Sequence, residues 1–171
     1  MRILGLDLGS KTLGIAISDT LGMVAHGVET YTFKTEHYKH AINYVSTFIK
    51  KENISTIVLG HPLNMDATEG ERAKRSRRFA QKVENATDVK VVLWDERLTT
   101  MQAERVLIDG GVRRENRKKH ADKLAATIIL QSYLDKNSPR EEKIILDEEN
   151  YEVDKERGVN NGRRNEQTNN Y

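Results

Sequence analysis

The chain begins with three segments in which apolar residues occupy every second position. In the first segment Leu4, Leu6 and Leu8 share one side and Asp7 lies on the other, which is the two-residue period of a β-strand. Short glycine-containing breaks separate the segments, as is typical of antiparallel strands joined by turns. The predicted strands are residues 2–9, 11–19 and 23–33. Together they predict a three-stranded antiparallel meander.

The pattern then changes to helical spacing and to continuous apolar runs. Tyr38, Ile42, Val45 and Ile49 form one apolar stripe, which predicts a helix over residues 37–51. The remaining predicted elements are buried strands at residues 54–60 and 89–94, a basic helix between them that ends near residue 84, and helices at about residues 99–108 and 122–134. This order predicts an α/β fold with a mixed five-stranded sheet, three antiparallel strands followed by parallel ones, flanked by helices.

The composition changes after residue 135. Acidic residues and Asn predominate in residues 136–171, where the cluster Ile144, Ile145 and Leu146 is the main apolar exception. A chain of 171 residues has room for one ordinary domain. We therefore predict one domain at residues 1–135 and a polar, flexible tail at residues 136–171.

Composition also excludes several kinds of chemical site and bears on location and charge. The chain contains no cysteine, which excludes disulfides, thiolate metal sites and cysteine nucleophiles. No apolar run is long enough to span a membrane and no secretory signal is visible at the N-terminus, so we expect a cytoplasmic protein. The net charge is +2, but the acidic tail conceals a modest basic excess in residues 1–135.

Carboxylates stand out at two strand positions. Asp7 lies inside an apolar strand, with Gly5 and Gly9 on the same side, where bare backbone would let a ligand or metal approach closely. Asp95 and Glu96 follow the second buried strand, at the edge where open α/β sheets usually place functional groups. Side chains alternate along a strand, so only one of these two carboxylates can face the same way as Asp7, and the sequence does not decide which.

A third carboxylate, Asp122, begins the last predicted helix. It shares a helix face with Ala125, Ala126 and Ile129, so we expect it to face the sheet. Each carboxylate alone has an ordinary explanation: a turn at a strand end, a surface ion pair with Arg97, or a favourable helix dipole. Three such positions together, without matching histidine or cysteine, instead favour Mg²⁺ or Mn²⁺, which prefer oxygen ligands.

Histidines and basic residues were considered as further candidates. The histidines show no zinc-type spacing and are interpreted as surface or packing residues: His26, His37, His40, His61 and His120. Basic residues cluster in the predicted helix at residues 72–78 and in a connection just before Asp122. The second cluster consists of Arg113, Arg114, Arg117, Lys118 and Lys119. Because it adjoins the carboxylates, we predict that it binds a nucleic-acid backbone, a solvated charged surface being the alternative.

Four motifs resemble the YqgF/RuvX family, which comprises Holliday junction resolvases and nucleases that mature small-subunit ribosomal RNA. The motifs are residues 7–11 (DLGSK), 60–66 (GHPLNMD), 95–100 (DERLTT) and 122–126 (DKLAA). The opening motif is shared with other families, but the last two at this spacing are specific. The resemblance covers residues 1 to about 135 and implies a ribonuclease H-like fold.

The resemblance also implies roles for individual residues. The implied catalytic residues and ligands of Mg²⁺ or Mn²⁺ are Asp7, Glu96 and Asp122. Residues implied to support them are Asp95, Lys11 and Arg97. The chain departs from the family pattern at His61, where an apolar residue is frequent, and at Ala67, where glycine is usual. If that loop requires a positive φ, Ala67 would strain it.

These inferences predict a divalent-metal-dependent nuclease that hydrolyses phosphodiester bonds, with 5′-end maturation of pre-16S ribosomal RNA as the preferred role. One alternative is Holliday junction resolution, which requires two active sites and therefore a dimer. Another is a nucleic-acid-binding module without catalysis. A phosphotransferase of the actin-like superfamily is disfavoured, because its nucleotide lies between two such domains. The sequence distinguishes neither RNA from branched DNA nor a monomer from a homodimer.

Overall fold

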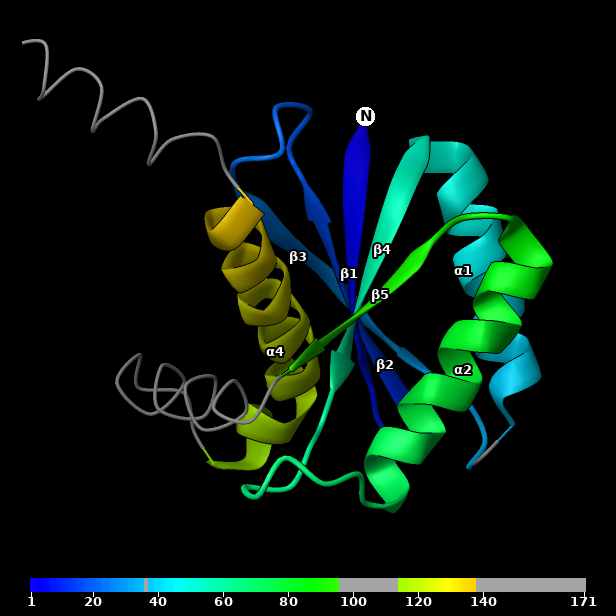
Figure 1. Cartoon of the computed structure of the whole chain (residues 1–171), viewed down its shortest axis with the longest axis vertical. Coiled ribbons are helices and arrows are strands. Elements are labelled where there is room, and N and C mark those ends of the chain that lie inside the picture. Colours follow the sequence, from blue (N-terminus) through cyan, green and yellow to red (C-terminus); the bar gives the residue numbers. More distant parts are fainter. Residues whose placement is uncertain (36, 96–113, 138–171) are drawn as a thin grey trace, which may run out of the picture. The chain divides into compact units, whose positions relative to one another are not determined.

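The computed structural model describes residues 1–35, 37–95 and 114–137, with side chains of the last range described from residue 121. The elements are β1 (Arg2–Leu8), β2 (Thr12–Ser18), β3 (Ala25–Thr32), α1 (Tyr38–Glu52), β4 (Ile54–His61), α2 (Glu71–Thr87), β5 (Val91–Asp95) and α4 (Arg114–Asn137) (Figure 1). Met1–Asn137 form one compact unit. Residues 136 and 137, the first two of the predicted tail, belong to α4, whereas residues 138–171 and the predicted helix at residues 99–108 lie outside the described residues.

The five strands form one mixed sheet in the order β3-β2-β1-β4-β5. Strands β1, β2 and β3 pair antiparallel, whereas β1 pairs with β4 and β4 with β5 in parallel. The predicted mixed sheet, with a meander followed by parallel strands, is confirmed. Strand β1 lies at its centre, so the carboxyl end of β1 is flanked by that of the parallel strand β4.

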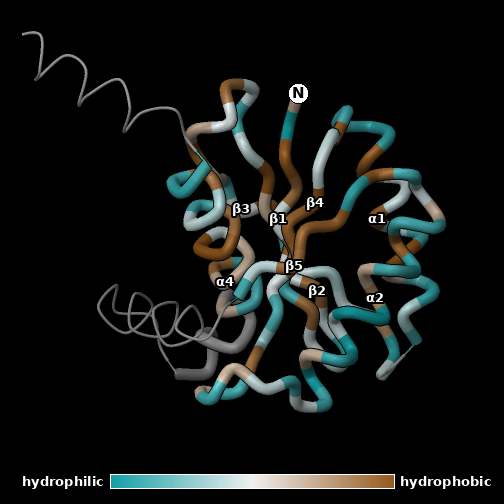
Figure 2. The backbone as a smooth tube through the Cα atoms, in the orientation of Figure 1, coloured by the Kyte–Doolittle hydropathy of each residue, from teal (hydrophilic) through white to brown (hydrophobic). Residues whose placement is uncertain are grey.

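Helices α1 and α2 cover one face of the sheet and α4 covers the other (Figure 1). On the α1/α2 face, Leu4 and Leu6 of β1 share a core with Val45 of α1 and with Phe79 and Val83 of α2. Figure 2 shows hydrophobic colours along the central strands and mostly hydrophilic ones along α2. Among the described helices, none combines the length and apolar character needed to cross a bilayer.

The α4 face owes its close packing to two glycines. A Cβ atom added to Gly5 would lie 2.6 Å from Cβ of Leu130, and one added to Gly14 would lie 2.0 Å from the backbone oxygen of Asp122. A Cβ atom on Gly9 would meet Oγ1 of Thr12 at 2.5 Å. The bare backbone around Asp7 therefore accommodates helix α4 and the adjoining turn, and the prediction that it is left open for a ligand is wrong.

Two predicted element descriptions require correction. Helix α4 begins at Arg114, so Arg114, Arg117, Lys118 and Lys119 belong to a helix rather than to a connection. The Arg, Glu and Lys residues there are good helix formers but lack the apolar periodicity on which the prediction relied. Strand β5 was predicted to be buried, but its residues are only partly buried or exposed, since it is an edge strand of the described sheet.

Candidate active site

Asp7 projects from the carboxyl-terminal end of β1 toward the α4 face. Its neighbour Leu6 belongs to the core on the α1/α2 face, and strand alternation places Asp7 on the opposite side. Asp7 pairs in register with Gly14 of β2, and Gly14 lies directly against the backbone of Asp122. Strand pairing and helix packing thus bring Asp7 and Asp122 together from positions more than a hundred residues apart.

The electrostatics of Asp7 confirm this juxtaposition. Burial, and after it the negative charge of Asp122, raises the pKa of Asp7 from 3.8 to about 7, whereas the positive charge of Arg72 opposes the rise. The folded protein therefore holds two carboxyl groups where ionisation of one disfavours ionisation of the other. A bound cation would relieve this repulsion, which makes the pair a candidate metal site.

The position of Asp122 removes its ordinary structural explanation. Because α4 begins at Arg114, Asp122 lies in the third turn, where the helix dipole no longer favours a carboxylate appreciably. The predicted inward face is confirmed, since Ala125, Ala126 and Ile129 are buried against the sheet. Asp122 itself is partly buried.

Arg72, in the first turn of α2, was not among the predicted site residues. Its side chain is exposed, yet its charge acts on Asp7. The sequence predicts it only as part of a basic helix, without a role at the site. The predicted topology could have identified Arg72. Because β1 and β4 are parallel, the helix that follows β4 starts at the same edge of the sheet as Asp7.

A compact loop from residue 62 to residue 70 leads from β4 into α2. Ala67 has φ 65°, so the positive φ that favours glycine is present at the position where this chain carries alanine. The Ala67 amide donates to the Asn64 carbonyl, and the Asn64 amide donates to that of Thr68. The Asp66 carboxylate accepts hydrogen bonds from the Thr68 hydroxyl and amide, which lower the pKa of Asp66. The loop is thus held by its own hydrogen bonds, with strain at Ala67.

His61 links the end of β4 to this loop. It is 7% exposed, and its Nε2 atom lies 2.9 Å from Oε1 of Glu69. The same Glu69 oxygen accepts a hydrogen bond from Arg77, and this contact links α2 to the loop. His61 is therefore a packed, hydrogen-bonded residue on the α1/α2 side of the sheet, in agreement with the prediction that it has a packing role.

The strand register distinguishes Asp95 from Asp7. Trp94 packs in the cluster on the α4 face, together with Val58 and Ala126, whereas Leu93 packs on the α1/α2 face. By alternation, Asp95 points to the α1/α2 face, opposite to Asp7. Asp95 pairs in register with His61, one strand further from β1.

The other predicted site residues are described only in part. Lys11 is exposed in the turn that follows β1, close to Asp7 along the chain. Glu96, Arg97 and Arg113 lie outside the described residues, as do the side chains of residues 114–119. Within the described ranges no group of three or more His, Asp or Glu side chains is placed to hold a metal ion. Asp7 and Asp122 are therefore two members of the predicted carboxylate set, whose predicted third member, Glu96, is outside those ranges.

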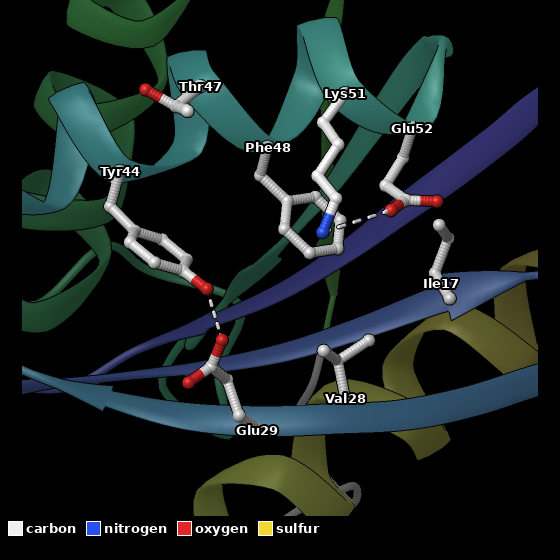
Figure 3. Close-up of a pocket in the computed structure, with 8 residues that line it drawn as sticks. All are labelled: Ile17, Val28, Glu29, Tyr44, Thr47, Phe48, Lys51 and Glu52. Atoms are coloured by element: carbon white, nitrogen blue, oxygen red, sulfur yellow. Dashed lines mark hydrogen bonds and ion pairs between the residues drawn. The ribbon is translucent and has the colours of Figure 1, made fainter.

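A separate cavity of about 450 Å³ lies between α1 and strands β2 and β3 (Figure 3). Several of its polar groups form hydrogen bonds or ion pairs with neighbouring residues. Tyr44 donates a hydrogen bond to Glu29, and burial, followed by this contact, raises the pKa of Tyr44 to about 12. Glu52 forms ion pairs with Arg2 at 2.7 Å and with Lys51 at 4.0 Å. None of the predicted site residues lines this cavity.

Comparison with known proteins identifies relatives over nearly the whole described unit. The model of a family described as "RuvX: Holliday junction resolvase" matches residues 1–136. A protein of Geobacillus sp. (strain WCH70) is 50% identical over 135 residues, covering 79% of this chain and 98% of the relative. One of Bacillus subtilis (strain 168) is 52% identical over 135 residues, with the same coverage. Both relatives are named as pre-16S rRNA nucleases, and both names mark this role as provisional.

Solved structures agree on the fold. The fowlpox virus resolvase in complex with its substrate Holliday junction DNA aligns with a TM-score of 0.50 and 16% identity, covering 80% of this chain and 98% of that one. The fowlpox virus Holliday junction resolvase, in a second structure, aligns with a TM-score of 0.50 and 14% identity, covering 80% and 99%. The sheet order and these likenesses establish the predicted ribonuclease H-like fold.

Proposed function

Since the chain belongs to the RuvX family, we propose that it is a divalent-metal-dependent nuclease that hydrolyses phosphodiester bonds of precursor 16S ribosomal RNA. The observation that carries the proposal is the apposition of Asp7 and Asp122 on the α4 face. The curated relatives share about half of their residues with this chain over almost their full length, and their name supports the RNA substrate. A cytoplasmic location would agree with such a role.

The two carboxylates fit a site for Mg²⁺ or Mn²⁺. Both ions prefer oxygen ligands, and a pair of carboxyl groups that repel one another gains from a cation between them. With a pKa of about 7, the Asp7 carboxyl group of the metal-free protein would be about half protonated at neutral pH. Binding of a cation would release that proton and favour the ionised pair.

Glu96 is the best candidate for a third ligand. Trp94 faces α4 and Asp95 faces the opposite side of the sheet, so Asp95 does not share the side of Asp7 and the other carboxylate of the motif is preferred. The proposal therefore takes Glu96 as a metal ligand and gives Asp95 at most a supporting role. The side chain of Asp95 points to the side of the sheet opposite to Asp7 and Asp122.

The remaining groups would act on the substrate. Divalent ions in such sites activate a water molecule for attack and stabilise the charge on the leaving oxygen. Asp7 and Asp122 would hold them, while Arg72 and Lys11 place positive charge beside the scissile phosphate. We include Arg97 in this supporting group on the strength of the family motif. We also retain the predicted role of the basic segment at residues 113–119 in holding the nucleic-acid backbone.

The test compares RNA and branched DNA directly. Purified full-length protein is incubated with Mg²⁺ or Mn²⁺ and either precursor 16S RNA or a DNA four-way junction, with sedimentation to determine the oligomer. We expect metal-dependent cutting of the RNA in preference to the junction. Symmetric cutting of the junction by a dimer, with the RNA left intact, would replace the RNA substrate by the one that the family description names. Binding of both substrates without hydrolysis in either metal would leave only a binding module.

A further inference from the structure

We infer that a row of cations along α2 binds the phosphate backbone of the substrate and guides it to the carboxylate pair. We name it the α2 cation row. It consists of Arg72, Arg75, Arg78 and Lys82. The inference rests on the proposed function for the identity of the ligand as RNA, and it concerns a surface distinct from the basic segment at residues 113–119.

The row follows one flank of α2, where Arg72, Arg78 and Lys82 are exposed and Arg75 is partly buried. The buried side consists of Ala73, Ser76, Phe79, Ala80 and Val83, which pack toward the sheet and α1. The row members follow one another at intervals of three or four residues, so they form a continuous strip on the helix surface. At about 1.5 Å per residue the strip extends roughly 15 Å, which is long enough to contact several successive phosphates of one strand.

Ion pairing separates the row from the other cations of the same helix. Lys74 is paired with Glu71 at 3.2 Å, and Arg77 is bound to Glu69. In contrast, no carboxylate within the described part of the chain forms an ion pair with a member of the α2 cation row. The remaining acid of the helix, Glu84, accepts a hydrogen bond from the backbone of Val91 at 2.8 Å. The neutralised cations and the unneutralised ones therefore form separate groups on α2.

The row begins at the active site. Arg72 is its first member and acts electrostatically on Asp7, and the helix then leads away from the edge where β1 and β4 end (Figure 1). A polyanion that lies along the row therefore has one end at the edge of the sheet where Asp7 lies. If these cations only made the helix surface soluble, they would not need to start at the candidate site. The α2 cation row does start there, at Arg72.

The test measures how RNA binding depends on salt. Full-length protein in EDTA, which prevents cleavage, is titrated with fluorescein-labelled precursor 16S RNA at several KCl concentrations. The variant Arg75→Gln/Arg78→Gln removes the positive charges of two row members that do not lie beside the carboxylates. Its matched control, Lys50→Gln/Lys90→Gln, removes the same charge from two exposed lysines outside α2. A second variant, Arg75→Lys/Arg78→Lys, keeps the charge.

We expect the salt slope of log K to become shallower by about 1.4 in the glutamine variant, since each phosphate contact contributes about 0.7 for single strands. The control pair and the lysine variant should keep the slope of the unmodified protein. An unchanged slope, or an equal loss in the control pair, would overturn the inference. Cleavage assays in Mg²⁺ separate it from the proposed function. Binding that depends on the row without any hydrolysis would refute the nuclease alone, and hydrolysis with an unchanged slope would refute the row alone.

Discussion

Replacement of Asp7 by Asn should stabilise the metal-free protein at alkaline pH. The folded pKa of Asp7 is raised from 3.8 to about 7, so the folded state loses stability as the pH rises from about 4 to about 7 and the carboxyl group ionises. A difference of this size corresponds to about 4 kcal/mol at ~1.4 kcal/mol per pKa unit. Relaxation around the charge reduces that cost, and we expect Asp7→Asn to gain about 2–4 kcal/mol at about pH 8.

The measurement is urea unfolding in EDTA at about pH 5 and about pH 8, where the linkage predicts that the stability difference between Asp7→Asn and the original protein widens by about 2–3 kcal/mol. Asp88→Asn is a matched control. Asp88 is exposed at the C-terminal cap of α2 with φ 55°, a conformation that Asn adopts readily. Its unfolding free energy should stay within about 0.5 kcal/mol of the original at both pH values.

Adding Mg²⁺ should reverse the ranking of the two proteins. A cation that binds the folded state stabilises the protein that retains both carboxylates and has little effect on Asp7→Asn. If Asp7→Asn instead lost stability equally at both pH values, the carboxylate would be held by favourable native partners, and the crowded pair would not exist.

Three further substitutions or truncations test local features of the fold. Ala67→Gly should stabilise the protein by about 0.5–1 kcal/mol, because it relieves a positive φ at the cost of chain entropy, and an unchanged urea midpoint would refute strain at this position. Gly14→Ala should cost about 2 kcal/mol or more, because its Cβ atom would lie 2.0 Å from the Asp122 carbonyl oxygen, and full stability would show that α4 can move away. Truncation after Lys136 should change the unfolding free energy by at most about 1 kcal/mol, and a larger loss would mean that the segment around Ile144 docks on the domain.

Much of the fold was predictable because its signals are local. The alternation through β1, β2 and β3 and the continuous apolar run in β4 were sufficient to predict a mixed sheet with an antiparallel meander followed by parallel strands. The start of α4 was not predictable in the same way, since residues 114–121 are helical without an apolar stripe. The partial burial of β5 depends on its position at an edge of the described sheet, which strand composition alone does not determine.

The candidate site was predictable as residue types rather than as geometry. Asp7 and Asp122 were identified from a carboxylate inside a strand and an inward helix face. The glycines were misinterpreted, because the close approach at Gly5 is made by α4 and that at Gly9 by Thr12, and both become evident only when helix packing and the turn are known. Arg72 was missed for a similar reason, since its influence on Asp7 arises from the adjacency of two parallel strands.

The most direct test of the account is single-turnover cleavage of precursor 16S RNA in Mg²⁺ by Asp7→Asn, Asp122→Asn and the control Asp88→Asn. Unfolding midpoints confirm that each variant is folded, and EDTA should abolish cleavage by the original protein. We predict that each of the first two substitutions lowers the cleavage rate by at least about 100-fold, the scale for losing a group that stabilises transition-state charge, and that Asp88→Asn leaves it unchanged. A folded Asp7→Asn or Asp122→Asn protein that cleaves at the original rate would contradict the assignment of this carboxylate pair as the catalytic centre.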